Sequence, residues 1–311
     1  RRPPRSTLSP SSAASDVYKR QVLDMAKVAS IAPANPGSMR EYVGIGKVKN
    51  KGLPMILVPT TAGTGSEISK TTMVIIGDLK TWIISPPLYP DVAVVDPLNT
   101  LTMPPRVTAM TGMDALAHLI EGYMSTLSSP VIDAFSLEGT RLIFKSLRKA
   151  FYNGEDLEAR FDMAVAASLG GYVLCGTPAV YGHSVSQTLA RYGTPHGIAC
   201  ALALPYVMEY NVPAIPERLA WLAKFMGVDT SGMSMEEAAK RAVNEVKRLV
   251  LDLKLPFTLQ DLKVPHEDLD MLANELIEKY YRKNNPRKMT PEEAKELYQK
   301  MWDGIVGDGG P

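Results

Sequence analysis

The chain has 311 residues, enough for two domains of ordinary size. Hydrophobic residues make up 45% of it and the formal net charge is +1. A sizeable core is therefore expected, and neither nucleic-acid binding nor an acidic tail is indicated. Cys175 and Cys200 share no CxxC spacing, and we interpret both as buried free thiols of a reducing compartment. No apolar stretch is long enough to span a bilayer, so we expect a soluble, cytoplasmic protein without a membrane partner.

Residues 1–21 are basic, rich in serine and proline, and almost free of large apolar side chains. A transit peptide has a similar composition, but Pro3, Pro4 and Pro10 do not suit the amphipathic helix of such a peptide. We favour a second interpretation, because the hexamer DVYKRQ resembles the translation of a transposon end used in preparing sequencing libraries. Residues 1–21 are then a non-native segment joined to a shortened gene, and we predict that they are disordered.

The part from 22 to 99 has the pattern of an incomplete α/β domain. Residues 22–33 have helical character, and a Gly-, Asn- and Lys-rich loop covers 34–52. Short apolar runs predict four strands, at 55–61, 71–77, 80–86 and 91–97. The short link at Gly77 and Asp78 predicts a hairpin between the second and third of them. One helix and four short strands make half of a doubly wound sheet.

From residue 100 to the C-terminus the pattern is entirely helical, and the proline-rich stretch at 95–106 marks the boundary. Proline at residue 130 and the sequence TPEE at 290–293 are start signals for helices. Helical periods predict nine helices, at 105–125, 130–152, 155–175, 179–191, 197–210, 215–226, 234–253, 266–283 and 290–304.

The four histidines suggest a metal site. Asp114 and His118 are four residues apart in TGMDALAHLIEGY, so a helix places both on one face. Such a pair binds a metal by the geometry of the HExxH helix, and a carboxylate among apolar neighbours needs a partner. Taken alone, a histidine on an apolar helix is usually a hydrogen-bonded core residue.

His183 and His196 are thirteen residues apart, and the turn between them can bring the second beside the first. With Asp114 and His118 they offer one carboxylate oxygen and three imidazole nitrogens, a set that suits Fe(II) or Zn(II), with Mn(II) or Co(II) as substitutes. His266 is instead expected to be a surface residue that opens a helix.

The segment VPTTAGTGSEIS at 58–69 follows a predicted strand and is rich in glycine, threonine and serine. Small residues let a backbone approach a phosphate closely, and amides and hydroxyls donate to its oxygens. Neither a Walker A loop nor a GxGxxG fingerprint is present, so an ordinary turn between strands is the alternative. Lys80 begins a nearby strand and is in reach of a pyrophosphate, or is simply solvated.

Together these motifs resemble the iron-containing (group III) alcohol dehydrogenase family. The resemblance rests on PTTAGTGSE, SPxLxPDVAVVDP, TMPPxVTAxTGMDALxHxIEGY, the PHG that follows a separate histidine, and LPYVMEYN. It runs from about Val22 to the C-terminus and includes NNPRKMT at 284–290.

The resemblance implies an α/β fold in which a partial doubly wound nucleotide-binding domain precedes an all-α metal-binding catalytic domain, as in dehydroquinate synthase-like enzymes. It places the catalytic metal on Asp114, His118, His183 and His196. It also implies NAD or NADP as cofactor and a homodimer. The cofactor-binding residues it implies are Asp24, Thr60, Thr61, Ala62, Gly63, Thr64, Thr71, Lys80 and Thr102.

The implied reaction is NAD(P)-linked oxidation of a small alcohol or reduction of an aldehyde. The metal polarises the substrate oxygen, and hydride passes to or from C4 of the nicotinamide. A glycerol-type polyol dehydrogenase of the same fold is one alternative. Another is an inactive metal-binding fragment that lacks the complete cofactor site.

Two positions depart from the family pattern. Members carry a GGGS turn before a helix that reads xxDxAK, and here Val22 to Lys27 match that helix while the glycines are absent. This departure is the reason to consider an N-terminally truncated member. Many members also have a histidine four residues after the third ligand, and Gln187 stands there instead. A histidine proton relay at this point is therefore not expected.

Overall fold

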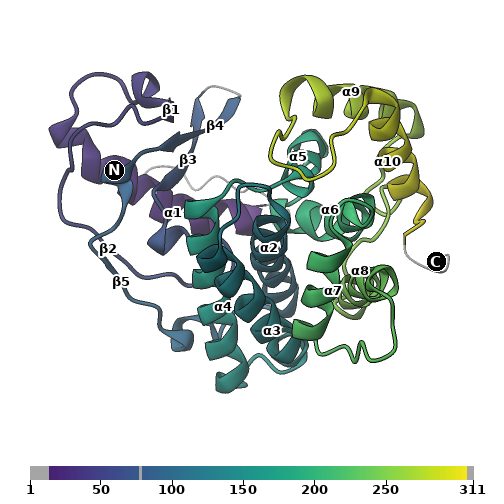
Figure 1. The fold of residues 1–311 in the computed structure, drawn as a ribbon. Coiled ribbons are helices and arrows are strands. Elements are labelled where there is room, and N and C mark those ends of the chain that lie inside the picture. Colours follow the sequence, from purple (N-terminus) through teal and green to yellow (C-terminus); the bar gives the residue numbers. More distant parts are fainter. Residues whose placement is uncertain (1–13, 77–78, 307–311) are drawn as a thin grey trace.

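The computed structural model describes residues 14–76 and 79–306. All strands within these ranges lie before residue 94, and they gather on one side of the molecule (Figure 1). The helices from residue 105 onward fill the other side. An α/β region followed by an all-helical region confirms the predicted fold class. The exact division at residues 99 and 100 stays a prediction.

The α/β region contains two small sheets rather than one. Its elements are α1 (Ala14–Ile31), β1 (Gly44–Ile45), β2 (Ile56–Leu57), β3 (Thr71–Ile76), β4 (Leu79–Ile84) and β5 (Val92–Ala93). One sheet has the order β1-β4-β3, with β1 parallel and β3 antiparallel to β4. The other is the parallel pair β2-β5. The antiparallel pairing of β3 and β4 confirms the predicted hairpin, although Gly77 and Asp78 lie outside the described residues.

Three predictions for this region need correction. Residues 14–21 belong to α1, so predicted disorder is wrong for them, while residues 1–13 lie outside the described residues. Pro10 is the last proline before this stretch, so its residues continue the helix of 22–31 without a break. The strands predicted at 55–61 and 91–97 shrink to two residues each, because prolines at 59 and 97 limit them. The short strand β1 lies inside the segment predicted to be a loop.

The nine predicted helices from residue 105 onward are confirmed. Two of them begin or end with a 3-10 turn, η6 (Leu189–Tyr192) after α5 and η7 (His266–Asp268) before α9. The α-helices are α2 (Pro105–Met124), α3 (Pro130–Tyr152), α4 (Leu157–Gly176), α5 (Tyr181–Thr188), α6 (His196–Asn211), α7 (Pro216–Phe225), α8 (Met235–Asp252), α9 (Leu269–Lys279) and α10 (Pro291–Asp303). Thr290 forms a capping box with Glu293 at the start of α10, as its sequence predicts.

The helix α2 runs through the middle of the helical region, and from Val107 to Met124 every residue is buried. It packs against α3, α4 and α6. Within the described part of the chain, no single helix has the length and apolar character needed to cross a bilayer. Only α4 and the bent continuation Tyr181–Tyr192, taken together, meet that criterion.

A buried lysine ties α1 to the loop that precedes β3. Lys27 is completely buried, and its ammonium donates to the carbonyl oxygens of Ser66, Ser69 and Thr71 at 2.6, 2.8 and 2.8 Å. Asp24, one turn earlier, accepts from Ser66 Oγ and from the Met73 N–H, both at 3.1 Å. A buried charge is stable only when it is paired and hydrogen-bonded, so this pair of side chains fixes the loop in place.

We expect Lys27→Met to destabilise the fold by about 1–3 kcal/mol or more, because three buried carbonyls lose their donor. Chemical denaturation monitored by circular dichroism measures this as a lower midpoint. Lys47→Met is the matched control, since Lys47 is exposed, and it should shift stability by less than about 0.5 kcal/mol. Equal midpoints for the two variants would show that the Lys27 contacts do not hold the loop.

Candidate metal centre

Asp114 and His118 lie one turn apart on α2, as their spacing predicts, and both are buried. Asp114 Oδ1 is 3.5 Å from His118 Nε2. The centre of α2 therefore presents a carboxylate and an imidazole side by side, away from solvent.

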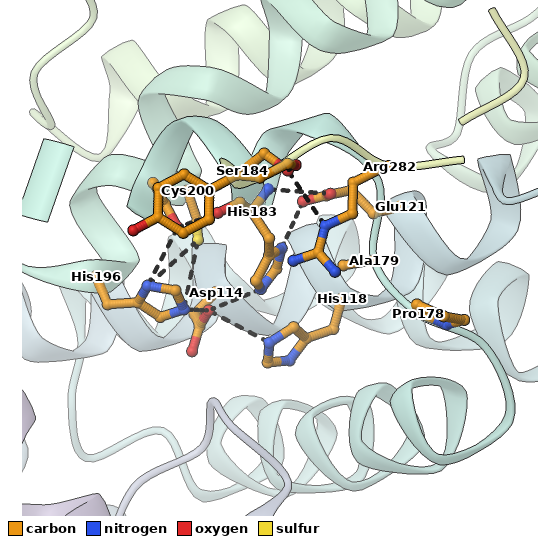
Figure 2. Close-up of polar contacts among 12 residues, drawn as sticks. Asp114, His118, Glu121, Pro178, Ala179, His183, Ser184, His196, Cys200 and Arg282 are labelled. Carbon is orange, nitrogen blue, oxygen red and sulfur yellow. Dashed lines mark hydrogen bonds and ion pairs between the residues drawn. The ribbon is translucent and has the colours of Figure 1, made fainter. Parts of the chain in front are cut away.

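The other two predicted ligands reach the same carboxylate oxygen from different helices (Figure 2). His183 comes from α5, and its Nε2 is 4.0 Å from Asp114 Oδ1. His196 is the first residue of α6, and its Nε2 is 3.6 Å from the same oxygen. The rings of His118 and His183 stack with their centroids 4.9 Å apart. The structure thus brings together all four residues that the sequence singled out.

The polar atoms at the centre of this group fit a divalent metal ion. Asp114 Oδ1 and His183 Nε2 are buried, and neither has a hydrogen-bond partner within the described chain. Zinc–nitrogen bonds of about 2.0–2.1 Å separate tetrahedral ligands by about 3.3–3.4 Å. The observed separations of 3.5, 3.6 and 4.0 Å from Asp114 Oδ1 are slightly wider, so a small contraction would close the group around an ion.

Glycines next to two of the histidines let the helices approach one another. A Cβ on Gly182 would lie 2.5 Å from Glu121 Oε1, and a Cβ on Gly197 would lie 2.3 Å from the Met110 carbonyl oxygen. Real Cβ atoms do not come so close, so any side chain at either position would push α5 or α6 away from α2. The dipeptides Gly182-His183 and His196-Gly197 therefore set the depth at which each imidazole sits.

Glu121 contacts His183 and was not among the predicted site residues, although it stands in the TGMDALAHLIEGY motif. It is fully buried and accepts from the backbone N–H of His183 at 3.1 Å, while its Oε1 lies 2.7 Å from His183 Nδ1. Because a carboxylate only accepts, Nδ1 carries a proton and donates it to Glu121, which leaves Nε2 as the nitrogen that faces Asp114. Glu121 lies seven residues after Asp114, which places the two carboxylates on the same face of α2, two turns apart. This spacing was the sign in the sequence that Glu121 lies near the site.

A cation lies beside Glu121. Arg282 donates from Nε to Ser184 Oγ at 3.2 Å and stands next to the Glu121 carboxylate in Figure 2. Burial lowers the pKa of Arg282, and the charge of Glu121 acts in the opposite direction. A guanidinium stays protonated under these conditions, so it offsets the charge of the buried carboxylate.

Cys200, like Glu121, lies beside the predicted ligands although it was not among the predicted site residues. It is buried and free, as predicted, whereas Cys175 is free but only half-buried, so the prediction of burial is wrong for Cys175. The Sγ of Cys200 lies 3.7 Å from His196 Nε2. The donor atoms of Asp114, His183, His196 and Cys200 all lie within 4.8 Å of one another, and His118 stands outside this mutual set. Burial raises the pKa of the Cys200 thiol, and the nearby His183 only partly offsets the shift.

The predicted nucleotide loop lies against the helices that carry the metal-binding candidates. A Cβ on Gly63 would lie 2.8 Å from Thr111 Cβ on α2, and one on Gly65 would lie 2.5 Å from Gly171 Cα on α4. Gly65 also has a left-handed backbone, with φ of 58°. These glycines are therefore required by helix packing, a reason that adds to the predicted approach of a phosphate.

The loop is close to the metal-binding candidates because of two adjacent residues of α4. A Cβ added to Gly171 would lie 2.6 Å from the Gly65 carbonyl oxygen. A Cβ added to Gly170 would lie 3.3 Å from the Cβ of His118, so the two glycines lie against the loop and against His118. The loop also follows β2 at the carboxyl end of the parallel pair β2-β5. In open α/β sheets, ligands bind at this edge.

The other predicted cofactor residues differ in their surroundings. Thr60 and Thr102 are exposed, Thr61 and Thr64 are half-buried, and Ala62 is buried against the helical core. Asp24 and Thr71 instead serve the Lys27 network described above, with the Asp24 side chain and the Thr71 carbonyl engaged inside the protein. Lys80 lies in β4, and its side chain is outside the described part of the structure.

Two predicted features outside the group are also placed. Gln187 lies one turn after His183 on α5, and its Oε1 is buried without a hydrogen-bond partner among the described residues. His266 opens η7 at the surface, as expected, and contacts Gln299 and Trp302.

Family models match the two parts of the chain separately. Residues 21–97 match the model described as iron-containing alcohol dehydrogenase, and residues 108–302 match the C-terminal model of the Fe-containing alcohol dehydrogenase family. Long-chain-alcohol dehydrogenase 1 of Geobacillus thermodenitrificans is 35% identical over 289 residues, which cover 91% of this chain and 73% of that protein.

Solved structures are similar over the same extent. An alcohol dehydrogenase from Oenococcus oeni superimposes with a TM-score of 0.86 at 36% identity, over 90% of this chain and 74% of that one. A sulfoacetaldehyde reductase from Bifidobacterium kashiwanohense in complex with NAD+ gives 0.83 at 30% identity, over 91% and 74%.

We expect Glu121→Gln to weaken metal binding by about 10- to 100-fold, because the substitution removes the charge that fixes the His183 tautomer. Competition with a chelator of known affinity measures the change. Asp162→Asn is the matched control, since Asp162 is a buried carboxylate of α4 that pairs with Ser146 and Lys145 instead. The role assigned to Glu121 is wrong if both variants bind metal as tightly as the unmodified chain.

Proposed function

The chain belongs to the iron-containing alcohol dehydrogenase family, and we propose that it is an NAD(P)-linked dehydrogenase of small alcohols that also reduces the matching aldehydes. The observation that carries this proposal is the convergence of three imidazole nitrogens on one buried carboxylate oxygen. The similarity to alcohol dehydrogenases extends over both the loop and the helices of this centre.

We propose Asp114, His118, His183 and His196 as the ligands of a divalent metal. Three nitrogens and one oxygen suit Fe(II), Zn(II) or Mn(II). Asp114 Oδ1 and His183 Nε2, which make no hydrogen bond among the described residues, support this assignment. A buried carboxylate oxygen without a hydrogen bond is costly unless a cation compensates its charge. A metal bound there supplies Lewis acidity toward the oxygen of an alcohol or aldehyde.

For the cofactor we propose the loop from Thr60 to Thr64 together with Thr102. The loop and the segment before α2 both follow the carboxyl ends of the β2-β5 pair, and the threonines proposed here are at least partly exposed. The similar reductase binds NAD+, which supports a nicotinamide cofactor, and NADP is the alternative. Asp24 contributes by holding Ser66, and so acts on the position of the loop rather than on the nucleotide.

The side chains divide the work of hydride transfer between binding and orientation. Asp114 supplies the negative charge that offsets a cation, and Glu121 orients His183 through its Nδ1 proton. Gln187 stands where a relay histidine is expected in many relatives, and an amide does not titrate. The proton of an alcohol therefore leaves by a route other than the side chain at this position.

A glycerol-type polyol dehydrogenase fits the same architecture, but no contact of the described residues favours it. A cytoplasmic homodimer remains part of the proposal, as does the division into residues 22–99 and 100–311. The alternative from another class is a metal-binding protein without dehydrogenase activity, which a cofactor titration separates from an enzyme.

We expect the chain loaded with Fe(II) or Zn(II) to oxidise NADH or NADPH in the presence of a short aldehyde. Asp114→Asn should lower this rate by about 100-fold, the upper end of the loss that follows disturbance of a metal site. The fall in reduced-cofactor absorbance measures the rate. His266→Gln changes a surface histidine outside the centre and should keep full activity.

Titration of NADH, followed by its fluorescence, gives an independent readout. Binding in the micromolar range supports the proposed cofactor loop. Retention of metal without any NADH binding would favour the metal-binding protein without dehydrogenase activity. A chain that binds NADH but shows no metal-dependent turnover with any short alcohol or aldehyde would contradict the proposed reaction.

A further inference from the structure

The thiol of Cys200 occupies the metal centre without a role in the activity described above. It lies one turn after His196 on α6, just as His118 lies one turn after Asp114 on α2. Residues four apart share a helix face, so α6 presents an imidazole and a thiol together. The centre therefore receives a pair of donors from each of two helices and a single donor, His183, from a third.

The distances at Cys200 match the edge of a metal coordination shell. Zinc bonds of about 2.3 Å to sulfur and about 2.1 Å to nitrogen place the two donors about 3.6 Å apart in a tetrahedron. The observed separation of Cys200 Sγ from His196 Nε2 is 3.7 Å. The sulfur approaches the same nitrogen that faces Asp114, at 3.6 Å, so one point in space is within reach of all three atoms.

Other atoms of the group point to a ligand as well. Asp114 Oδ1 is buried and has no hydrogen-bond partner in the described chain, and a carboxylate oxygen of Asp114 lies within 4.8 Å of Cys200 Sγ. His183 Nε2 is buried and makes no hydrogen bond of normal geometry among the described residues, while the His183 ring interacts with the Cys200 thiol. His118, in contrast, does not belong to the mutually close set. The group that is already compact enough for an ion thus contains the cysteine and omits one of the four ligand candidates.

We propose that Cys200 is a direct thiolate ligand of the metal, which makes the centre of this chain one that selects Zn(II) over Fe(II). This inference rests on the metal site proposed above and adds a sulfur to its donor set. Thiolate ligands are soft and favour zinc, whereas carboxylate and imidazole donors alone discriminate less between divalent ions. Binding forms a metal–sulfur bond and releases the thiol proton to solvent.

Cobalt(II) is the probe, because cobalt–thiolate bonds give an intense charge-transfer band in the near ultraviolet and d–d bands in the visible report binding itself. We expect the Co(II)-loaded chain, prepared without oxygen and with a phosphine reductant, to show both. Cys200→Ser should lose the charge-transfer band and keep the d–d bands. Cys175→Ser is the matched control and should keep both, since Cys175 lies outside the group and approaches the Ile68 carbonyl.

Metal competition supplies a second readout that does not depend on activity. After equilibration with equal amounts of Fe(II) and Zn(II), elemental analysis gives the ratio of bound zinc to bound iron. We expect this ratio to fall by about tenfold in Cys200→Ser. This is the lower end of the loss in metal affinity that follows removal of a residue that supports a metal site. An unchanged ratio would count against the proposal.

The spectra separate this inference from the proposed function. Co(II) bound with d–d bands but no charge-transfer band in the unmodified chain overturns the thiolate ligand and leaves the metal site standing. Failure to bind Co(II) at all overturns both. If Cys200→Ser does not fold, the spectrum of the unmodified chain beside that of Cys175→Ser still decides, because any remaining thiolate band then belongs to Cys200.

Discussion

A buried carboxylate is the constraint on which the rest of this structure depends. Asp114 sits in the middle of a helix whose residues from Val107 to Met124 are all buried, and one of its oxygens has no hydrogen bond among the described residues. Removing a carboxylate from water without compensation is very costly. The fold meets this cost by bringing imidazoles from α2, α5 and α6 to the same oxygen, an arrangement that a divalent cation completes.

The packing around α2 follows from that requirement. Helices ordinarily lie roughly 8–10 Å apart, and larger side chains at the contact give larger separations. Glycines at 182 and 197 bring α5 and α6 close to α2, and the pair Gly170-Gly171 lets α4 touch both His118 and the loop at Gly65. The same helices therefore hold the metal-binding candidates and the loop proposed for the nucleotide. Shared helix packing thus fixes the position of one site relative to the other.

The sequence predicted the helical half of this picture well, because its helices are long, amphipathic or fully apolar, and marked by prolines and caps. It predicted the α/β half less well. The strands β1, β2 and β5 are two residues each, too short to show a period, and they form separate sheets that no local pattern specifies. Composition predicts disorder at residues 14–21, yet no proline interrupts the helix there.

At the metal centre, Asp114 and His118 carried their own signal as DxxxH and His196 carried one as PHG, whereas His183 was identified by its place before PHG and by the family resemblance. Glu121 and Cys200 carried a weaker signal. Each is defined by what it touches, His183 Nδ1 in one case and His196 Nε2 in the other, and both contacts join different turns or helices. Glu121 follows Asp114 by two helical turns and Cys200 follows His196 by one turn, spacings that place each on the face of a ligand candidate without marking it as a site residue. Only the assembled fold shows that they face the imidazoles of this centre.

The charges of the centre explain why two carboxylates can be buried within two helical turns of each other. Asp114 and Glu121 are both nearly inaccessible, and two negative charges in one apolar helix repel each other. The negative charge of Glu121 is offset by the guanidinium of Arg282, and the carboxylate also accepts a hydrogen bond from His183 Nδ1. Among the described residues, Asp114 Oδ1 has no hydrogen-bonded cation of this kind. The compensation that it lacks is positive charge located between Asp114 and the three imidazoles, which is the position where a divalent ion would bind.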